Sequence, residues 1–374
     1  MASEKIEVTY VFGFGRSDLI SSNEKFANDF FYGYFNFLKK YKNIKFLEFN
    51  DNKKSVLSII SKILRKLTKL SFFIENICSV HNFKILWKTK HIIATNDRIG
   101  VSLMPFLIVY KFFNVNKTSV IVMGLLAKET TNIINHILQR LLLNIFFYLC
   151  SDFIFLSKSE LKQAQVSYKR FKHKFHFIPF CIDTEFWKID KDKNFDRNKI
   201  IFVGNDGRRD YDLVLKIAKE LPEYEFLVIT SNIDSSELLS QNVELVKGSW
   251  NKRILSDDDL KRYYQKSLLS IIPINNTYQP SGQSVALQSM AMGVPVMITD
   301  TIGFWDREIF RDKDNIFFAT DNNLNTWVEN IKNIINNPQI KDLVSENGNK
   351  TVNQSYNSEF FYESLEKILF KPLN

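Results

Sequence analysis

Short apolar segments alternate with longer amphipathic segments along the whole chain, and this rhythm restarts near the middle. The predicted strands of the first half are 6–12, 44–49, 91–95, 119–123, 152–156 and 174–178. Those of the second half are 199–203, 224–230, 243–246, 268–273 and 295–299. Nearly continuous apolar strands separated by amphipathic helices are typical of parallel sheets covered by helices on both faces. The sequence therefore predicts an α/β protein with two Rossmann-like domains.

The turn-rich segment 179–187 separates the two series of strands, and the charge balance also changes there. Residues 1–190 hold 28 Lys and Arg against 15 Asp and Glu, a net charge of +13. The remaining residues hold 22 against 26, a net charge of −4, which together give the +9 of the chain. A length of 374 residues fits two domains. We predict domains at 1–182 and 183–357, with a last helix in 358–374 that packs back on the first domain.

Cysteine usage and hydropathy indicate a cytoplasmic protein. Cys78, Cys150 and Cys181 are odd in number and far apart, so neither a disulfide framework nor a metal-ligand spacing is expected. The start of the chain does not resemble a signal peptide, and no run of about 18 apolar residues predicts a transmembrane helix. Because the cysteines show no metal-ligand spacing, we expect no bound metal, and no cofactor is expected either.

The most informative segment, 280–300, reads as a small-residue loop, a helix, a glycine stop and a strand. Gly293 suits the end of the helix, and Pro295 follows it. The loop Ser281–Gln283 lies just before the helix, where free amides and the helix dipole favour a phosphate group. Gly282 lets a ligand approach the backbone closely. The segment thus predicts a site for a phosphorylated ligand.

Three polar residues of this segment, Ser281, Ser284 and Gln288, are spaced by three and four positions and share one helix face. The opposite face is apolar and is expected to pack inward. A polar stripe on an otherwise buried helix indicates contact with a ligand.

These motifs resemble those of the large retaining glycosyltransferase family of GT-B fold that includes sucrose synthases and glycolipid mannosyltransferases. Residues 288–291 and 293–296 match the second half of its signature, and 202–204 match the first strand of its C-terminal domain. Pro179 with 182–186 matches its interdomain segment. The matches cover about half of the chain, all from residue 179 onward, whereas the first domain matches by strand order alone.

The resemblance implies two Rossmann-like domains facing across a cleft and transfer of a sugar with retained anomeric configuration. It implies a UDP- or GDP-sugar donor and a glycan or lipid-linked saccharide acceptor. Arg208, Arg209 and the amide of Gln283 would stabilise the leaving diphosphate without a metal. The implied nucleotide contacts are Gly204, Ser281, Gly282, Ser284 and Gln288. Trp250 either stacks on the base or belongs to the core.

The chain departs from the family pattern at four places. The first is Asn205, which stands where one residue of a basic pair is expected, although Arg208 could supply the missing charge. Gln288 replaces a glutamate that binds the ribose, Pro280 replaces an earlier glutamate, and 122–124 lack the histidine of the first domain. These differences leave open a non-catalytic partner subunit that keeps the fold and binds a sugar nucleotide or a glycan. An inverting enzyme is a further alternative, with Asp18 or Asp97 as its base.

Three further residues are candidates for contact with the sugar or the acceptor. Gly13 and Gly15 follow the first predicted strand, where they either approach the substrate or form a tight turn. Asp306 follows the predicted strand 295–299 and could hydrogen-bond a sugar hydroxyl.

The segment 53–90 holds nine basic residues and one acidic residue, Glu75. Its apolar residues follow helical spacing, so we expect a long basic amphipathic helix over about 53–80. Such a helix either lies on an anionic membrane surface or faces the core with a lysine-rich solvated side. No nucleic-acid motif accompanies the basic residues, and nucleic acid is not an expected partner.

Overall fold

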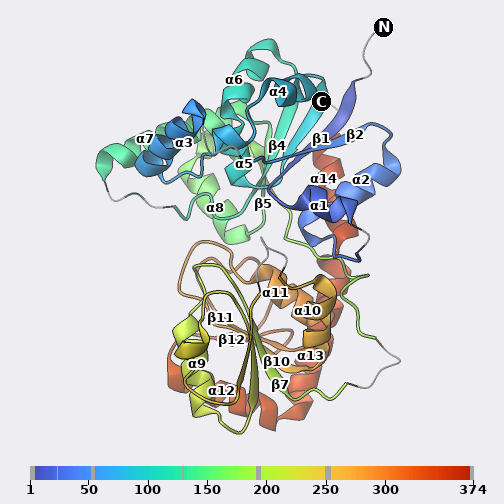
Figure 1. The fold of residues 1–374 in the computed structure, drawn as a ribbon, viewed down its shortest axis with the longest axis vertical. Coiled ribbons are helices and arrows are strands. Elements are labelled where there is room, and N and C mark those ends of the chain that lie inside the picture. The colour runs from blue at the N-terminus through green and yellow to red at the C-terminus, as the bar shows by residue number, and fades with distance from the viewer. Residues whose placement is uncertain are drawn as a thin grey trace. The chain divides into compact units, whose positions relative to one another are not determined.

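The chain folds into two compact α/β units (Figure 1). This computed structural model describes residues 5–22, 24–51, 55–128, 130, 132–190, 195–248 and 254–370. The N-terminal unit comprises 1–23, 31–179 and 361–374, and the C-terminal unit comprises 24–30 and 180–360. Residues 24–30 therefore belong to the second unit, although the sequence analysis assigned them to the first domain.

The N-terminal unit contains a six-stranded parallel sheet in the order β2-β1-β3-β4-β5-β6. Its strands are β1 Ile6–Phe12, β2 Ile44–Glu48, β3 Thr89–Ala94, β4 Lys117–Val122, β5 Asp152–Phe155 and β6 Phe175–Phe177. The central strands are buried almost throughout, because helices cover both faces of the sheet. Strand β2 lies on one side of β1 within the sheet, and β3 to β6 lie on the other side. The strand order therefore reverses between β1 and β3, which is the topological switch point of this sheet.

The N-terminal unit also contains the following helices and short 3-10 turns. They are α1 Arg16–Ser21, η1 Asp29–Phe31, α2 Tyr34–Lys40, α3 Val56–Thr68, η2 Ile74–Asn76, α4 Val80–Trp87, α5 Asp97–Ser102, α6 Met104–Phe113, α7 Ile133–Leu149, α8 Lys158–Ser167 and η3 Lys169–Lys174. The turn η1 spans the boundary between the two units.

The long helix expected over 53–80 is wrong, because α3 ends at Thr68. Lys69 adopts the left-handed conformation with φ 58° and ends the helix. The Thr68 hydroxyl donates to the Leu64 carbonyl at 2.7 Å and accepts from the Leu70 amide at 3.3 Å. The chain then turns inward, and Leu70 is fully buried. Burial of the residues after Lys69 outweighs continuation of the helix.

Helix α2 is short and lies between α1 and β2. Gly33 precedes it with φ 79°, and a Cβ at this position would lie 3.2 Å from Tyr362 of α14 (Ser358–Leu369). Phe37 and Tyr362 pack edge to face with ring centroids 4.9 Å apart. The last helix therefore packs on the N-terminal unit through close contact with α2.

The C-terminal unit contains a second parallel sheet in the order β12-β11-β10-β7-β8-β9. Its strands are β7 Lys199–Val203, β8 Glu225–Ile229, β9 Val243–Val246, β10 Ser267–Ile272, β11 Val296–Thr299 and β12 Phe317–Ala319. The helices are α9 Tyr211–Glu220, η4 Ser235–Glu237, α10 Asp257–Gln265, α11 Gln283–Ala291, α12 Leu324–Asn336 and α13 Pro338–Ser355. This is the Rossmann strand order, with its switch point between β7 and β10.

Helix α11 is fixed at its C-terminal end by donors from outside the helix. The Asn349 side-chain amide donates to the carbonyls of Met290 and Ala291 at 3.2 and 2.8 Å. Arg197 donates to the Met292 carbonyl at 2.8 Å and also to Gly293. These bonds satisfy carbonyls that a helix end otherwise leaves open. They hold the helix so that its N-terminus stays at the carboxyl edge of the sheet.

Within the described parts of the chain, no helix combines the length and the apolarity that crossing a bilayer requires.

Candidate functional site

Two loops meet at the switch point of the C-terminal unit, one after β7 and one after β10. The Asp210 amide donates to the Pro273 carbonyl at 3.0 Å, and the Asn275 amide donates to the Arg208 carbonyl at 2.8 Å. These backbone bonds join the loops at the carboxyl edge of the sheet. Ligands of open α/β sheets bind at this kind of edge.

Arg209 is the central side chain of this edge and is only 5% exposed. Its Nη1 donates to Ser281 Oγ at 2.6 Å and lies 3.2 Å from Asp206 Oδ2. Ser281 Oγ donates to the same carboxylate oxygen at 2.7 Å. Burial lowers the pKa of Arg209, and the nearby Asp206 carboxylate opposes that shift. Arginine and serine from the two loops thus share one acidic partner.

Gly204 makes room for this arginine. A Cβ at position 204 would lie 2.7 Å from Arg209 Nε and 2.8 Å from its Cγ. Arg209 Nε is buried and has no hydrogen-bond partner among the described residues. The guanidinium is therefore held in place and keeps an unused donor.

The N-terminus of α11 lies beside this arginine, through the Arg209–Ser281 bond. Gly282 precedes the helix with φ 84°, and it has no side chain that could cap the first amides. A Cβ there would lie 3.1–3.2 Å from Ile272, Ile274 and Ile298. The helix dipole favours an anionic group at this point.

Arg208 adds a second cation to the same loop. Its Nε donates to Gln279 Oε1 at 3.3 Å, and its side chain is half-buried. The structure therefore brings Arg208 and Arg209 together with Gly204, Ser281 and Gly282, as the sequence analysis expected. Gln283 is buried and starts the helix, and Ser284 is half-buried in its first turn.

Gln288 does not lie at the Arg209 site. The three polar residues predicted to share one face of the helix therefore do not form one site. The Gln288 side chain is fully buried. Its Nε2 donates to Asp29 Oδ2 at 2.7 Å, and its Oε1 accepts from the Tyr264 hydroxyl at 3.3 Å. The expected contact with a nucleotide is not available in this arrangement, because protein groups on neighbouring elements occupy the amide.

Asp29 is the buried residue that the sequence analysis missed. Its Oδ1 accepts from the Asp183 amide at 2.7 Å, and its Oδ2 accepts from Trp187 Nε1 at 2.9 Å as well as from Gln288. Burial raises the pKa of Asp29 to about 7, although these three donors favour the ionised form. The carboxyl joins three chain segments inside the C-terminal unit. No sequence signal marks it, because its partners lie 154 to 259 positions away.

Asp306 was expected to contact a sugar, but the structure buries it. The side chain is 2% exposed, and its Oδ2 accepts from the Tyr356 hydroxyl at 3.1 Å. Burial and the adjacent Asp306 carboxylate raise the pKa of Tyr356. Asp306 therefore anchors the loop after β11 to the end of α13, because its carboxylate faces a buried tyrosine rather than solvent.

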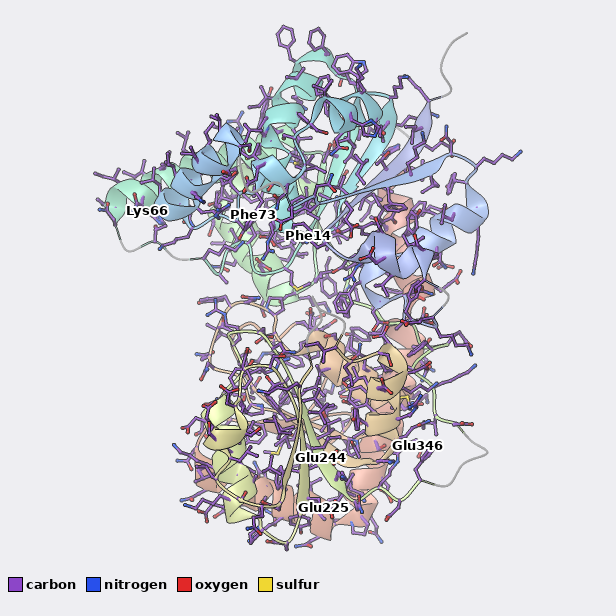
Figure 2. The ribbon with its side chains drawn as sticks, in the orientation of Figure 1. Phe14, Lys66, Phe73, Glu225, Glu244 and Glu346 are labelled. Atoms are coloured by element: carbon purple, nitrogen blue, oxygen red, sulfur yellow. The ribbon has the colours of Figure 1, made fainter. Side chains whose placement is uncertain are left out.

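Gly13 and Gly15 lie at the switch point of the N-terminal unit, directly after β1. Gly15 has φ 85° and caps α1, whose first amides, Arg16 and Ser17, donate to the Glu48 carboxylate. The space around a Cβ at Gly13 is open. Phe14 lies between the two glycines in the sequence, and its ring is half-exposed (Figure 2). The loop forms a tight turn and leaves its outer side accessible.

The remaining acidic and aromatic candidates have different positions. Asp97 accepts from Lys128 Nζ at 2.6 Å, so its carboxylate is already paired. Asp18 lies in the first turn of α1. Trp250 lies outside the described residues. Val203, Ile229, Gly248 and Ser256 are among the residues that line a small cavity of about 30 Å³ at the ends of β7 and β8.

A larger cavity of about 440 Å³ lies beside α7 and α8 in the N-terminal unit. Its lining is mainly polar and basic, with Lys128, His136, Gln139 and Arg140 among its residues. Among the residues that the structure describes, no three His, Cys, Asp or Glu side chains are grouped as a metal site requires.

Comparison with known families agrees with the geometry of the second unit. Residues 183–351 match the family described as Glycosyl transferases group 1. The family model thus covers most of the C-terminal unit. The chain is also similar in sequence to "Capsular polysaccharide biosynthesis glycosyltransferase CapM" of Staphylococcus aureus, with 22% identity over 154 residues. That match covers 41% of this chain and 35% of the relative, about a third of the relative's length.

Solved structures extend the likeness to the whole fold. HepE of Anabaena in complex with UDP and glucose superimposes with a TM-score of 0.67, at 12% identity, over 98% of this chain and 100% of HepE. Sucrose-phosphate synthase of Thermosynechococcus elongatus gives a TM-score of 0.69, at 12% identity, over 97% and 98% of the two chains. The GT-B fold expected from the sequence is thereby confirmed.

Proposed function

We propose that this protein transfers a sugar from a nucleoside-diphosphate donor, UDP- or GDP-linked, to a glycan or a lipid-linked saccharide. The single observation that carries the proposal is Arg209, which is held over Gly204 and hydrogen-bonded to Ser281 beside the N-terminus of α11, in the region that matches the group 1 family. A buried cation next to the N-terminal end of a helix is suited to a diphosphate, because the helix dipole also favours negative charge there. UDP is the first donor to test, because solved structures of HepE contain UDP and UDP-glucose.

Departure of the diphosphate is the step that these residues would assist. Negative charge develops on the leaving oxygen, and Arg208, Arg209 and the first amides of α11 are placed to stabilise it. Asp206 and Ser281 orient the guanidinium before the donor binds. Two arginines supply the positive charge that a metal provides in other transferases, so we propose a metal-independent reaction. Retention of the anomeric configuration is part of this proposal and rests on the family resemblance.

The acceptor is expected to bind the N-terminal unit. The polar cavity beside α7 offers Lys128, His136 and Arg140, which suit saccharide hydroxyls and phosphate oxygens. The name of the CapM relative points to a capsular polysaccharide as an example of such an acceptor. We also propose a cytoplasmic location, with the basic segment 53–90 on an anionic membrane.

A non-catalytic sugar-nucleotide or glycan-binding subunit is the second candidate, and Gln288 favours it. Its amide is occupied by Asp29 and Tyr264, so the ribose contact expected at this position is missing. Binding of a nucleotide without turnover would support this second function.

The test is an assay of nucleotide release from UDP- and GDP-sugars, with and without saccharide acceptors. We expect release with one donor class, and a product whose anomeric proton signal in NMR matches the donor configuration. Arg208→Ala should lower turnover at least about tenfold, because it removes one charge from the diphosphate site. Arg262→Ala is the matched control, because Arg262 is an exposed arginine on α10. Binding without turnover in any condition would refute the enzymatic proposal.

A further inference from the structure

Helix α3 of the N-terminal unit buries polar side chains and exposes most of its large apolar ones. Its buried residues are polar, namely Ser58, Ser61 and Thr68. Ser61 Oγ donates to Glu75 Oε2 at 2.5 Å and accepts from the Ile74 amide at 3.0 Å, so the inner face is satisfied by hydrogen bonds. A helix that served only to cover the core would bury its apolar residues instead. The inner face of α3 therefore does not explain most of its large aliphatic side chains.

Leu57 and Leu64 of α3 pack against the core, but the other five apolar residues of the helix face outward. They are Val56, Ile59, Ile60, Ile63 and Leu67, all exposed, with Val56 at 74% and Ile63 at 52%. At 3.6 residues per turn these positions fall within an arc of about 100°. Isolated exposed aliphatic residues are ordinary, but a continuous stripe of five marks an interaction surface.

Helix α7 carries a second stripe of the same kind and lies against α3 (Figure 1). Gln139 of α7 donates to the Thr68 carbonyl of α3 at 2.9 Å, which fixes the two helices together. The exposed residues of this stripe are Ile133, Ile134, Ile137, Leu141 and Tyr148, with Ile133 at 77% and Ile137 at 62%. The second stripe lies outside the basic segment 53–90 recognised in the sequence. We call the two stripes the α3–α7 surface.

The charged residues around this surface are basic, which indicates an anionic partner. Lys62 and Lys66 flank the apolar stripe of α3 and are exposed, and Arg140 is exposed on α7. Figure 2 shows Lys66 at the end of the N-terminal unit where α7 also lies. The sequences of α3 and α7 contain no Asp or Glu. Two copies of such a surface would oppose like charges, whereas an anionic bilayer offers both apolar depth and negative headgroups.

We infer that the N-terminal unit docks on an anionic lipid bilayer through the α3–α7 surface. The isoleucines enter the boundary between headgroups and acyl chains, and the flanking lysines remain at the level of the headgroups. The inference does not depend on catalysis, because docking requires neither donor nor acceptor.

The experiment is co-sedimentation of the full chain with vesicles of phosphatidylcholine alone or with about one-third phosphatidylserine. We expect binding to the anionic vesicles at least about tenfold stronger than to the neutral ones, and weaker binding at high salt. Ile63→Ser with Ile137→Ser should lower binding to anionic vesicles about tenfold or more, because two aliphatic groups no longer enter the bilayer. Lys62→Glu with Lys66→Glu should lower it similarly through charge repulsion.

Leu343→Ser is the matched control, because Leu343 is a half-exposed leucine on α13 of the C-terminal unit. It should bind vesicles as the unchanged protein does. All substituted residues are exposed, so unfolding temperatures should stay within about 2 °C of the unchanged protein. Absence of binding to anionic vesicles would overturn the inference. A stable dimer that Ile63→Ser with Ile137→Ser dissociates would also overturn it, and would assign the surface to a second copy. UDP-induced stabilisation is measured separately, so failure of docking and failure of the proposed activity are distinguishable.

Discussion

At the scale of a single residue, the close approach of Arg209 to Gly204 offers a direct test of the proposed diphosphate site. A Cβ at position 204 would overlap the Arg209 side chain at 2.7–2.8 Å, so Gly204→Ala should displace the guanidinium. We expect nucleotide affinity to fall about tenfold or more, which corresponds to at least ~1.4 kcal/mol. Titration calorimetry with the bound nucleotide measures the change.

Gly207→Ala is the control for that substitution. Gly207 lies in the same loop, and no atom lies within 4 Å of a Cβ built there. Its affinity should match that of the unchanged protein. Equal affinities for both variants would show that the position of Arg209 does not matter for binding.

Two buried carboxyls, Asp29 and Glu160, predict how stability depends on pH. Burial raises the pKa of each to about 7, although backbone amides hydrogen-bond both. In the unfolded chain each loses its proton near pH 4. The folded state therefore holds more protons between pH 4 and 7, and the stability from these groups falls as pH rises through 7. The slope is at most about 1.4 kcal/mol per pH unit for each group.

Thermal unfolding at pH 5, 6 and 7 checks this prediction by comparison of variants. Glu160→Gln should flatten the decrease of the unfolding temperature, because the titrating group is gone. It should also lower stability by about 1–3 kcal/mol, because the Gly124 and Leu126 amides both donate to this carboxylate. Asp342→Asn, at an exposed position, is the control and should leave the slope unchanged. An unchanged slope in Glu160→Gln would contradict the raised pKa.

At the scale of elements, the sequence predicted the bounds of those helices and strands whose ends are marked by glycine or proline. Helix α11 and the flanking strands β10 and β11 lie within one residue of their expected bounds, because Gly282, Gly293 and Pro295 mark their ends. The end of α3 has no glycine or proline, so periodicity alone extended that helix to residue 80. Its true end depends on the burial of Leu70, which is a tertiary effect.

Some residues of the candidate site could be predicted from the sequence, and others could not. Ser281, Gly282 and the two arginines were predictable, because a parallel sheet brings the loops after β7 and β10 to one edge. The interior position of Gln288 was not predictable, because its partners Asp29 and Tyr264 come from distant segments. Helical spacing identifies a shared face but does not reveal what covers it.

Lys69 offers a prediction about the end of α3. It holds φ 58° as the residue after the helix, a conformation that glycine adopts without strain. Lys69→Gly should therefore raise the free energy of unfolding by up to about 1 kcal/mol. Lys66→Gly, inside the helix, should lower it by about 1 kcal/mol. Chemical denaturation measures both, and a loss of stability in Lys69→Gly would show that α3 ends elsewhere.

At the scale of the whole molecule, the two units differ in charge and in exposed apolar surface. The excess of basic residues lies in 1–190, where the net charge is +13, and the region that matches the group 1 family falls mainly in the half with a net charge of −4. The first unit carries the α3–α7 surface, and the second carries the arginine pair. This division is consistent with the function that we propose, in which the acceptor is met at a membrane and the donor is taken from solution.

The measurement that tests the central claim most directly is calorimetric titration of the full chain with UDP and with GDP, repeated with Arg209→Ala. We predict saturable binding of one of the two nucleotides at one site per chain, lost or weakened at least about tenfold in Arg209→Ala. Arg262→Ala should bind as the unchanged protein does. If neither nucleotide binds, or if Arg209→Ala binds as tightly as the unchanged protein, the diphosphate site assigned to Arg209 and the start of α11 is wrong.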